Sequence, residues 1–419
     1  MARLSPRATA QKPKAAAVDP VTRAFETVIA KVRTLRLDGQ VADYIPELAK
    51  ADPEEFAIAA TSVSGHVYNA GDSSSLFTIQ SISKAFVYAL ALSVHGFEAV
   101  LRHVGVEPSG EPFNAISFDE RNRPANPLIN AGAVVTTSLI PAASSEERFE
   151  QILAGLSSFA GRELDVNEAV YASESATGDR NRALAMLARS YGVLDSDVDA
   201  AIEPYFRQCA LMVDCTDLAV MGATLANHGQ NPITGRQVVS PIVARQVLSL
   251  MSSCGMYDRS GQWLFDVGMP AKSGVGGGIV AVAPGEYGIG VYSPPLDIAG
   301  NSSRGVVALR ALAEEFGLHL FNHPARPASP VARITTNDGD GAITLHLRGT
   351  IDFVAAEQIV YAAAEALTEG AGTRLVLDLA DVTAVTTVAT RLIRDLPDHS
   401  GMTRGRQVTV HDPSGVLAN

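Results

Sequence analysis

The sequence predicts an α+β protein with two domains: an antiparallel sheet combined with a helical subdomain, followed by a small α/β domain. Strand-like stretches occur within residues 55–72 and 263–294, and the pattern between them is mostly helical. Strands at both ends of a domain are expected to meet in one antiparallel sheet. A proline-rich stretch at 322–330 then precedes alternating strand and helix patterns. We therefore expect a disordered tail at 1–20, a first domain at 21–321, a linker at 322–330 and a second domain at 331–419.

Within the first domain, the spacing of apolar residues and the turn residues predict the individual elements. Apolar residues at helical spacing predict an opening amphipathic helix, and Ser64-Gly65 is a predicted hairpin turn between two strands. The expected order is a helix at about 21–36, two strands within 55–72, a helix over 77–87, mostly helices from about 83 to 250, short strands over 263–294, and a closing helix at about 301–316.

The second domain is predicted from a regular alternation of strands and helices. A turn is expected at the sequence NDGDG, where glycine and aspartate residues gather. The expected order is a strand at 331–336, the turn, a strand at 342–347, a helix at about 353–367, a strand at 374–379, a helix at about 387–396 and a strand at 407–410.

The composition is that of an ordinary globular protein and excludes several classes of partner. Hydrophobic residues make up 47% and charged residues 19% of the chain, and no apolar run is long enough to cross a bilayer. The net charge of −12 argues against nucleic acid or an anionic membrane, because both favour basic surfaces. The histidines are scattered and no acid-rich loop has calcium spacing, so neither a metal nor another cofactor is expected.

The cysteines and the N-terminus bear on the cellular compartment. Cys209, Cys215 and Cys254 contain no C-x-x-C pair, and an odd number gives no closed disulfide framework. A cytoplasmic location is therefore expected. The basic N-terminal stretch lacks the apolar core of a secretory signal, although an organelle transit peptide would share its basic, alanine-rich composition.

A serine and a lysine three residues apart suggest nucleophilic chemistry. In a helix over FTIQSISKAFV, Ser81 and Lys84 share one face, so a lysine amine can meet a serine hydroxyl. A lysine removes the proton of a serine only when its amine is neutral, and apolar neighbours favour that state by desolvation. The alternative is that S-x-x-K occurs by chance, as it does in many helices.

A second stretch, AKSG at 271–274, strengthens the catalytic hypothesis. A lysine–serine–glycine strand opposite an S-x-x-K helix is the pairing that penicillin-binding serine enzymes use. The glycines that follow expose backbone N–H groups, so one of these and the N–H of Ser81 could form an oxyanion hole. Alternatively, a glycine-rich strand only allows close packing.

Seven motifs occur in order along the chain. They are YIPELA, FTIQSISK, NPLINAGA, SESATGDRN, PYFRQC, SCGMYDRSGQ and PAKSGVGGG. Together they resemble the serine-dependent glutaminases, a family with a β-lactamase-like fold. The resemblance covers about 25–320 and implies hydrolysis of L-glutamine to L-glutamate and ammonia, and commonly a homo-oligomer, either a dimer or a tetramer.

The resemblance also implies roles for individual residues. Ser81 would be the nucleophile, with Lys84 and Tyr257 as the base system, and sequence alone leaves open which of the two takes the proton. The N–H groups of Ser81 and Val275 would hold the oxyanion. Glu174 would bind the substrate ammonium. The remaining substrate-binding positions are Asn130, Asn181 and Tyr205, which can donate to the carboxylate, with Val275 and Tyr257, and with Tyr44 and Gln80 as walls.

Each of these residues has a structural alternative. An asparagine in NPLINAG can be a cap or turn residue, and a tyrosine can be a core aromatic with a satisfied hydroxyl. A penicillin-binding or β-lactamase type of hydrolase is the alternative enzyme, but the sequence has no S-D-N triplet between the two lysine motifs.

The second domain resembles the STAS domains, the fold of anti-sigma-factor antagonists, through LRGTIDFVAAEQIV and LVLDLADVTAVTTVATRLI. Members that switch by phosphorylation have Asp-Ser-Ser/Thr at the start of the second helix, where this chain has Thr386, Thr387 and Val388. We therefore favour a structural or oligomer-forming module over binding of a protein partner. The remaining alternative is a regulatory binding module built on a decayed glutaminase.

Overall fold

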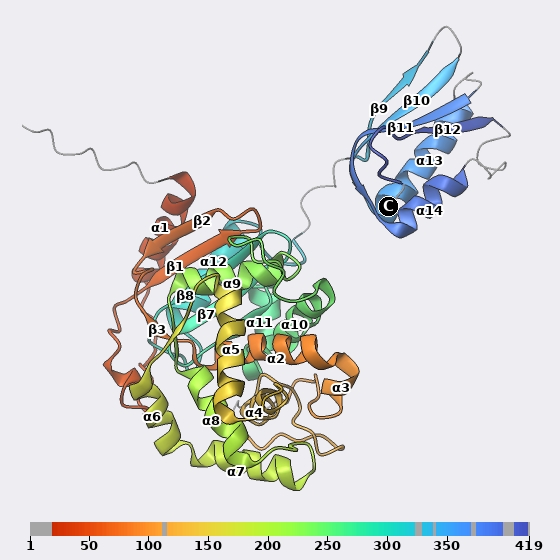
Figure 1. Cartoon of the computed structure of the whole chain (residues 1–419). Coiled ribbons are helices and arrows are strands. Elements are labelled where there is room, and N and C mark those ends of the chain that lie inside the picture. The colour runs from red at the N-terminus through yellow and green to blue at the C-terminus, as the bar shows by residue number, and fades with distance from the viewer. Residues whose placement is uncertain are drawn as a thin grey trace, which may run out of the picture. The chain divides into compact units, whose positions relative to one another are not determined.

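The computed structural model describes residues 19–110, 115–322, 329–337, 341–369, 374–396 and 406–417. The chain forms two compact units, Met1–Asn322 and His323–Asn419 (Figure 1). Most of the predicted tail, most of the predicted linker and the centre of the NDGDG turn lie outside the described residues.

The first unit is built on a five-stranded antiparallel sheet. Its strand order is β2 (Val67–Gly71), β1 (Ala57–Ser62), β8 (Tyr287–Tyr292), β7 (Gly278–Ala283) and β6 (Ala271–Ser273). Because β1 pairs with β8, strands from the two ends of the unit lie side by side, as the red and teal arrows in Figure 1 show. The predicted meeting of both ends in one sheet is confirmed, and so is the hairpin at Ser64-Gly65.

Both faces of β1, β8, β7 and β6 are buried, because alternate residues of these strands enter different cores, whereas the edge strand β2 is largely exposed. Ile58 and Ala60 pack with α1 (Pro20–Arg33) and α12 (Ser303–Glu315). Ala57 and Ala59 pack with the opposite core, which contains α2 (Ser83–His95), α9 (Cys215–Ala226) and α10 (Pro241–Cys254).

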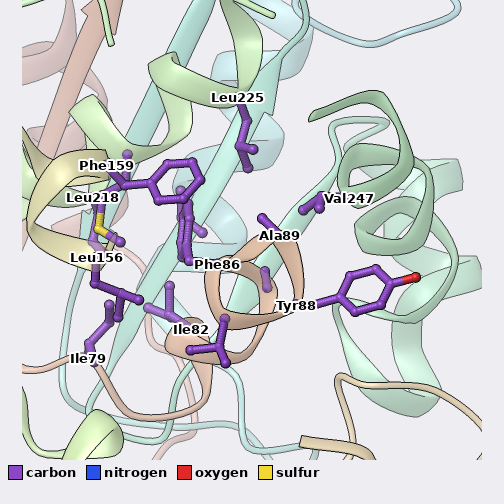
Figure 2. Packing of buried hydrophobic residues seen from close by; sticks show 14 of the residues in the cluster. Ile79, Ile82, Phe86, Tyr88, Ala89, Leu156, Phe159, Leu218, Leu225 and Val247 are labelled. Carbon is purple, nitrogen blue, oxygen red and sulfur yellow. The ribbon is translucent and has the colours of Figure 1, made fainter. Parts of the chain in front are cut away.

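Helix α2 runs through the centre of that opposite core. Figure 2 shows Ile82, Phe86 and Ala89 of this segment among side chains from the surrounding helices. A helix that is apolar on nearly all sides is stable only when it is enclosed. Its position is therefore fixed on several sides by close packing. The neighbours labelled in Figure 2 are Leu156 and Phe159 of α5 (Ser145–Ala160), Leu218 and Leu225 of α9, and Val247 of α10.

The structure corrects two boundaries. The predicted helix over 77–87 is divided into β3 (Phe77–Thr78), the 3₁₀ helix η2 (Gln80–Ile82) and α2. β3 pairs with β5 (Leu211–Val213), which pairs with β4 (Asp165–Val166), so the helical middle contains a small sheet that the sequence did not predict. The strands predicted from 263 begin only at β6, because Trp263 belongs to α11 (Ser260–Asp266) and its indole N–H donates to Met269 O at 2.7 Å.

The mostly helical middle is confirmed, and further elements within it and on either side of it position the site. These are η1 (Leu48–Lys50), α3 (Phe97–Leu101), α4 (Asn130–Ser138), α6 (Glu168–Thr177), α7 (Asp179–Ser190), α8 (Val198–Cys209) and η3 (Tyr257–Arg259). Nowhere in the described part of the chain does a helix have both the length and the apolar composition needed to cross a membrane.

The described residues of the second unit form a four-stranded sheet and two helices in the predicted order. The strands are arranged β12 (Gln407–His411), β11 (Arg374–Val385), β10 (Ala342–Ile351) and β9 (Val331–Thr336), and only β9 is antiparallel to its neighbour. β10 and β11 extend beyond the predicted 347 and 379. Helices α13 (Phe353–Glu369) and α14 (Thr387–Asp395) share one apolar core with the sheet.

Candidate active site

Ser81 lies in η2, at the turn that leads from β3 into α2, and it is 8% exposed. The preceding residue, Gln80, has φ = 49°, a left-handed conformation that is uncommon for a residue with a side chain. Such strained residues occur preferentially at active sites, where close packing maintains them. The turn is enclosed by the core around α2, so the serine is presented from a rigid element.

Lys84 lies in the first turn of α2 and is only 1% exposed. The pKa of the Lys84 amine is lowered to about 8. Burial is the largest cause, and the charge of the nearby Lys272 acts in the same direction. Its Nζ donates a hydrogen bond to Asn130 Oδ1 at 2.5 Å, and Asn130 Nδ2 donates to Asn181 Oδ1 at 2.9 Å. Among the described residues, the lysine is therefore held by Asn130 and forms no hydrogen bond with Ser81. A substantial fraction of this amine is neutral near pH 8, as a base requires.

A cavity of about 370 Å³ lies in front of Ser81, and we call it the catalytic cavity. It brings together residues from the N-terminal segment, η2, α4, α6, α7, α8 and the turn after β6. The predicted residues that line it are Tyr44, Gln80, Ser81, Asn130, Glu174, Asn181, Tyr205 and Val275. Lys84 and Tyr257 are not among its lining residues in the described structure. Lys84 is buried and bonded to the lining residue Asn130, and Tyr257 lines a second groove that shares Tyr44 and Val275 with the cavity.

Glu174 provides a buried carboxylate on α6. It is 9% exposed, and burial raises its pKa to about 7, although hydrogen bonding from Gln80 and the charge of Lys84 act in the opposite direction. A carboxylate without full solvation is stabilised by a cation that enters the cavity. The site is therefore electrostatically prepared for a ligand with an ammonium group.

Two tyrosines complete the walls of the catalytic cavity. Tyr205 of α8 is 3% exposed, and Lys84 Nζ lies 6.0 Å from the centre of its ring. Tyr44 is 53% exposed as a residue, but it also lines the cavity. Burial of the hydroxyl groups, with a smaller effect of the charge on Glu174, raises the pKa of both tyrosines well above the usual value. Both phenols are therefore protonated and can donate hydrogen bonds.

Tyr257 occupies η3 with φ = 57°, and its hydroxyl donates to Ser273 O at 3.4 Å. The approach of its segment to β6 depends on Gly255, because a Cβ there would lie 1.7 Å from Ala271 O. Lys272 packs beneath the ring, with Nζ 4.0 Å from the ring centre of Tyr257 and a hydrogen bond to Ser273 O at 2.7 Å. Lys272 is fully buried, and this burial lowers its pKa well below the usual value.

The turn after β6 places Val275 at the cavity. A Cβ on Gly274 would lie 2.9 Å from Ile79 O, and one on Gly276 would lie 2.8 Å from Thr78 O, so glycine permits the turn to approach η2. Gly274 N and Gly277 N form backbone hydrogen bonds, whereas Val275 N forms none with the residues that the structure describes. This N–H is therefore available to a ligand.

The catalytic cavity also contains residues that sequence reasoning missed. Thr177, Gly178 and Arg180 stand in the motif SESATGDRN beside Asn181, so this motif could have identified them. Cys209 belongs to PYFRQC, and burial raises the pKa of its thiol to about 12, so it stays protonated and is a poor nucleophile. Ser81 is left as the better nucleophile of the two.

The profile of the glutaminase family matches residues 39–321, which include every predicted site residue. The chain belongs to the glutaminase family. It is 44% identical over 404 residues to a protein named glutaminase from Corynebacterium glutamicum, covering 95% of each chain. It is 55% identical over 287 residues to glutaminase 2 of Bradyrhizobium diazoefficiens, covering 68% of this chain and 46% of the length of that relative.

Solved structures agree with this assignment over both units. A crystal structure of Mglu in its native form at 4.3 M NaCl has a TM-score of 0.85 and 41% identity, covering 96% of this chain and all of the other. A structure of Mglu in its glutamate form has a TM-score of 0.83 and 40% identity over the same shares.

Proposed function

We propose that Ser81 is the nucleophile in the hydrolysis of L-glutamine to L-glutamate and ammonia. Hydrolysis of glutamine itself follows from membership of the glutaminase family. The observation that supports the proposal best is that a buried serine and the buried carboxylate of Glu174 line the same cavity. Glutamine has an ammonium at one end and the reacting amide at the other, which suits a cavity with these two groups.

Substrate binding is proposed to use the groups already described. Glu174 binds the α-ammonium by a charge-assisted hydrogen bond. Asn181, Asn130 and Tyr205 offer amide and phenol donors for the α-carboxylate. Tyr44 and Gln80 form walls that limit access of water. The side-chain amide then extends toward Ser81.

In the first chemical step, Ser81 Oγ attacks the amide carbon while the base system of Lys84 and Tyr257 takes its proton. The N–H groups of Ser81 and Val275 are proposed to hold the oxyanion. The C–N bond breaks, the proton passes to the leaving nitrogen, and ammonia departs. Asn130 orients the Lys84 amine throughout.

The second step is hydrolysis of the γ-glutamyl ester on Ser81. The same base system removes a proton from water, which attacks the ester carbon, and the proton returns to Ser81 Oγ as glutamate forms. Tyr257 lies between Lys272 and the site, so its hydroxyl is the member of the base system that is fixed by β6.

Replacement of Ser81 tests this mechanism. The Ser81→Ala variant is expected to release ammonia from glutamine at least about 10³-fold more slowly, while circular dichroism stays unchanged. The matched control is Ser93→Ala, at an exposed position on α2, the helix that follows η2, which should keep full activity. Mass spectrometry of acid-quenched wild-type enzyme should detect a γ-glutamyl adduct that the Ser81→Ala variant lacks; full activity of that variant would refute the assignment.

For the architecture, we propose a β-lactamase-like fold for the first unit, based on its antiparallel sheet, helical middle and S-x-x-K helix opposite β6. The second unit is proposed to be STAS-like, based on its alternating strands and helices. The proposed domain limits remain 21–321 and 331–419, with 322–330 as a linker.

The second unit is proposed to support a homo-oligomer, a dimer or tetramer, and binding of a protein partner is the alternative. Deletion of 331–419 tests this role: a smaller assembly in light scattering with retained ammonia release would favour oligomer formation. A cytoplasmic location is proposed because Cys209, Cys215 and Cys254 are free and buried. Cell fractionation that finds the protein outside the cytoplasm would contradict this proposal.

A further inference from the structure

A buried network of polar side chains leads from α4 through α8 to the start of α2, and we call it the Ser83 network. The hydroxyl of Thr137, on α4, donates to Gln208 Oε1 at 3.0 Å. Gln208 Nε2, on α8, donates to Ser83 Oγ at 3.4 Å. All three residues are 0% exposed, and none of them lines the catalytic cavity in the described structure. Their polar groups therefore cannot contact the substrate directly.

The Ser83 network ends on the backbone carbonyl of Gln80, the residue before the proposed nucleophile. Ser83 Oγ donates to Gln80 O at 2.7 Å, and the N–H of Ser83 donates to the same oxygen. Gln80 has φ = 49°, and such an unfavourable backbone conformation persists only where surrounding contacts hold it. The network is therefore one of the contacts that hold the turn before Ser81 in its shape.

The carbonyl of Gln80 belongs to the peptide group whose other end is the N–H of Ser81. This peptide is trans, and in a planar trans peptide the C=O and N–H bonds point in opposite directions. Since Gln80 O is directed at Ser83, the N–H of Ser81 points away from the network. Ser81 lines the catalytic cavity, and its N–H forms no hydrogen bond with the residues that the structure describes. The network thus fixes the plane of the peptide that carries the proposed oxyanion donor.

The hydrogen bonds of the Ser83 network all donate in the same direction. Thr137 donates to Gln208, and Gln208 donates to Ser83. Ser83 then donates to Gln80 O. Hydrogen bonds in such a series polarise one another, and the effect is larger in a buried site than in water. Because resonance couples the two ends of a peptide, a hydrogen bond to its C=O also makes its N–H a stronger donor. The network therefore orients the N–H of Ser81 and strengthens it.

We propose that Ser83 and Gln208 are positioning residues of the oxyanion hole, which hold the Gln80–Ser81 peptide in the orientation that stabilises the transition state. This inference rests on the proposed role of Ser81 and deepens it. Negative charge develops on the substrate oxygen only during the reaction, so the loss of either residue should lower kcat and leave KM nearly constant. The alternative is an ordinary helix contact, since serine hydroxyls often donate to a carbonyl three or four residues earlier. That role would affect stability but not the transition state selectively.

Variants of the network test the proposal through ammonia release from glutamine. Ser83→Ala is expected to lower kcat by about tenfold or more, while KM stays within about twofold. Gln208→Leu nearly keeps the size of the side chain and should lower kcat by about threefold. The double variant should have the kcat of Ser83→Ala alone, because Gln208 acts through Ser83. The matched control is Thr136→Val, which removes a hydroxyl that is 1% exposed as a residue and donates to Gly132 O at 2.8 Å, outside the network. Its kcat should stay unchanged.

A transition-state probe separates binding of the oxyanion from folding. In 2-amino-4-boronobutanoic acid, boron replaces the side-chain carboxyl carbon of glutamate. The boron accepts an electron pair from Ser81 Oγ, whose proton passes to the base system, and the adduct is tetrahedral and anionic like the transition state. Ser83→Ala should weaken inhibition by this compound about tenfold. Inhibition by L-norvaline, which has a methyl group in place of the amide, should change by less than about twofold. Thr136→Val should change neither.

The outcomes distinguish this inference from the proposed mechanism. Circular dichroism shows whether each variant is folded, and Gln208→Leu decides if Ser83→Ala does not fold. A wild-type kcat in the folded variants, or equal weakening of the boronate and of L-norvaline, would overturn the positioning role. So would a shift in the pH dependence of kcat/KM, because that would mean that Ser83 acts on Lys84. If Ser81→Ala kept its activity, the proposed mechanism itself would fail; an inactive Ser81→Ala beside a fully active Ser83→Ala would refute only the positioning role.

Discussion

The two larger sheets of this protein differ in how their ionisable side chains are placed. The five-stranded sheet is covered on both faces, and Lys84 and Lys272 are buried beside it with lowered pKa values. The four-stranded sheet of the second unit has a polar row outside its apolar core, where Asp378 accepts hydrogen bonds from His346 at 2.8 Å and from His411 at 2.9 Å.

This difference explains where chemistry is expected. In the first unit, burial penalises the charged forms of Lys84 and Glu174, so both groups titrate near neutral pH. In the second unit, the partly exposed Asp378 has two partners, and the hydrogen bond from His411 is the largest cause that lowers its pKa. The first arrangement creates reactive groups, and the second satisfies polar groups at the surface.

The largest expected effect comes from removing the amine of Lys84, the proposed base. The Lys84→Met variant keeps a long side chain but no amine, so kcat for ammonia release should fall by about 10²–10⁴-fold. Ammonia release is measured at saturating glutamine, and circular dichroism controls for folding. A loss of less than tenfold would show that Tyr257 alone provides the base.

Covering both faces of the sheet also requires small residues at the contact with α9. A Cβ on Gly288 of β8 would lie 1.9 Å from Ala223 N, so Gly288→Ala should lower the free energy of unfolding by about 3 kcal/mol. Thermal denaturation measures this effect. Gly261→Ala is the control, since its Cβ would meet no atom within 4 Å. Equal stability of the two variants would contradict the proposed packing.

The buried carboxylate of Glu174 should lower the free energy of unfolding, although it is proposed to bind the substrate. The pKa of Glu174 is raised to about 7 in the folded protein. Between pH 4.5 and 7 the folded protein therefore binds more protons than the unfolded chain. The contribution of protonated Glu174 to the free energy of unfolding is lost as the pH rises through this range. Glu174→Gln should therefore raise the free energy of unfolding at pH 8 by about 1–3 kcal/mol. It should also raise KM for glutamine strongly.

Denaturant titrations at pH 8 and pH 4 check this prediction. The gain should vanish at pH 4, where Glu174 is protonated in both states. The control is Glu163→Gln, at an exposed position, which should change neither stability nor KM. A gain that is the same at both pH values would point to packing instead of charge.

The pH dependence of activity should follow the same two groups. Glu174 must be ionised and Lys84 neutral, so kcat/KM should rise with pH through about 7 and about 8. Initial rates of ammonia release from pH 5 to pH 9 measure this rise. In Glu174→Gln, the step near pH 7 should disappear; a profile that is flat from pH 6 to 9 would oppose both assignments.

The smallest effect is expected in the polar row of the second unit. Asp378→Asn removes a partly exposed charge, so the free energy of unfolding should fall by no more than about 1 kcal/mol, and kcat should stay unchanged. Differential scanning calorimetry and ammonia release measure the two quantities. A marked loss of activity would show that the two sheets are not functionally separate.

The sequence by itself predicted the order of most elements and the groups that are proposed to react. Local sequence patterns can be recognised without knowledge of the tertiary packing. They include the spacing of Ser81 and Lys84, the glycines after Lys272 and the motif around Glu174. The β-rich stretches between turn residues likewise predicted strands of the five-stranded and four-stranded sheets, but not the small sheet of β3, β4 and β5. The errors lay at boundaries, such as Trp263, where packing overrides propensity.

Only the tertiary structure determined the hydrogen-bond partners and the pKa values of these site residues. Lys84 is held by Asn130, which lies 46 residues away in sequence, instead of by the neighbouring Ser81. The ring of Tyr257 is fixed by Lys272 and by the close approach that Gly255 allows. Desolvation depends on how distant segments enclose a side chain, so it cannot be read from spacing. The sequence therefore specified a serine, a lysine and an acid, and the fold determined that two of them titrate near neutral pH.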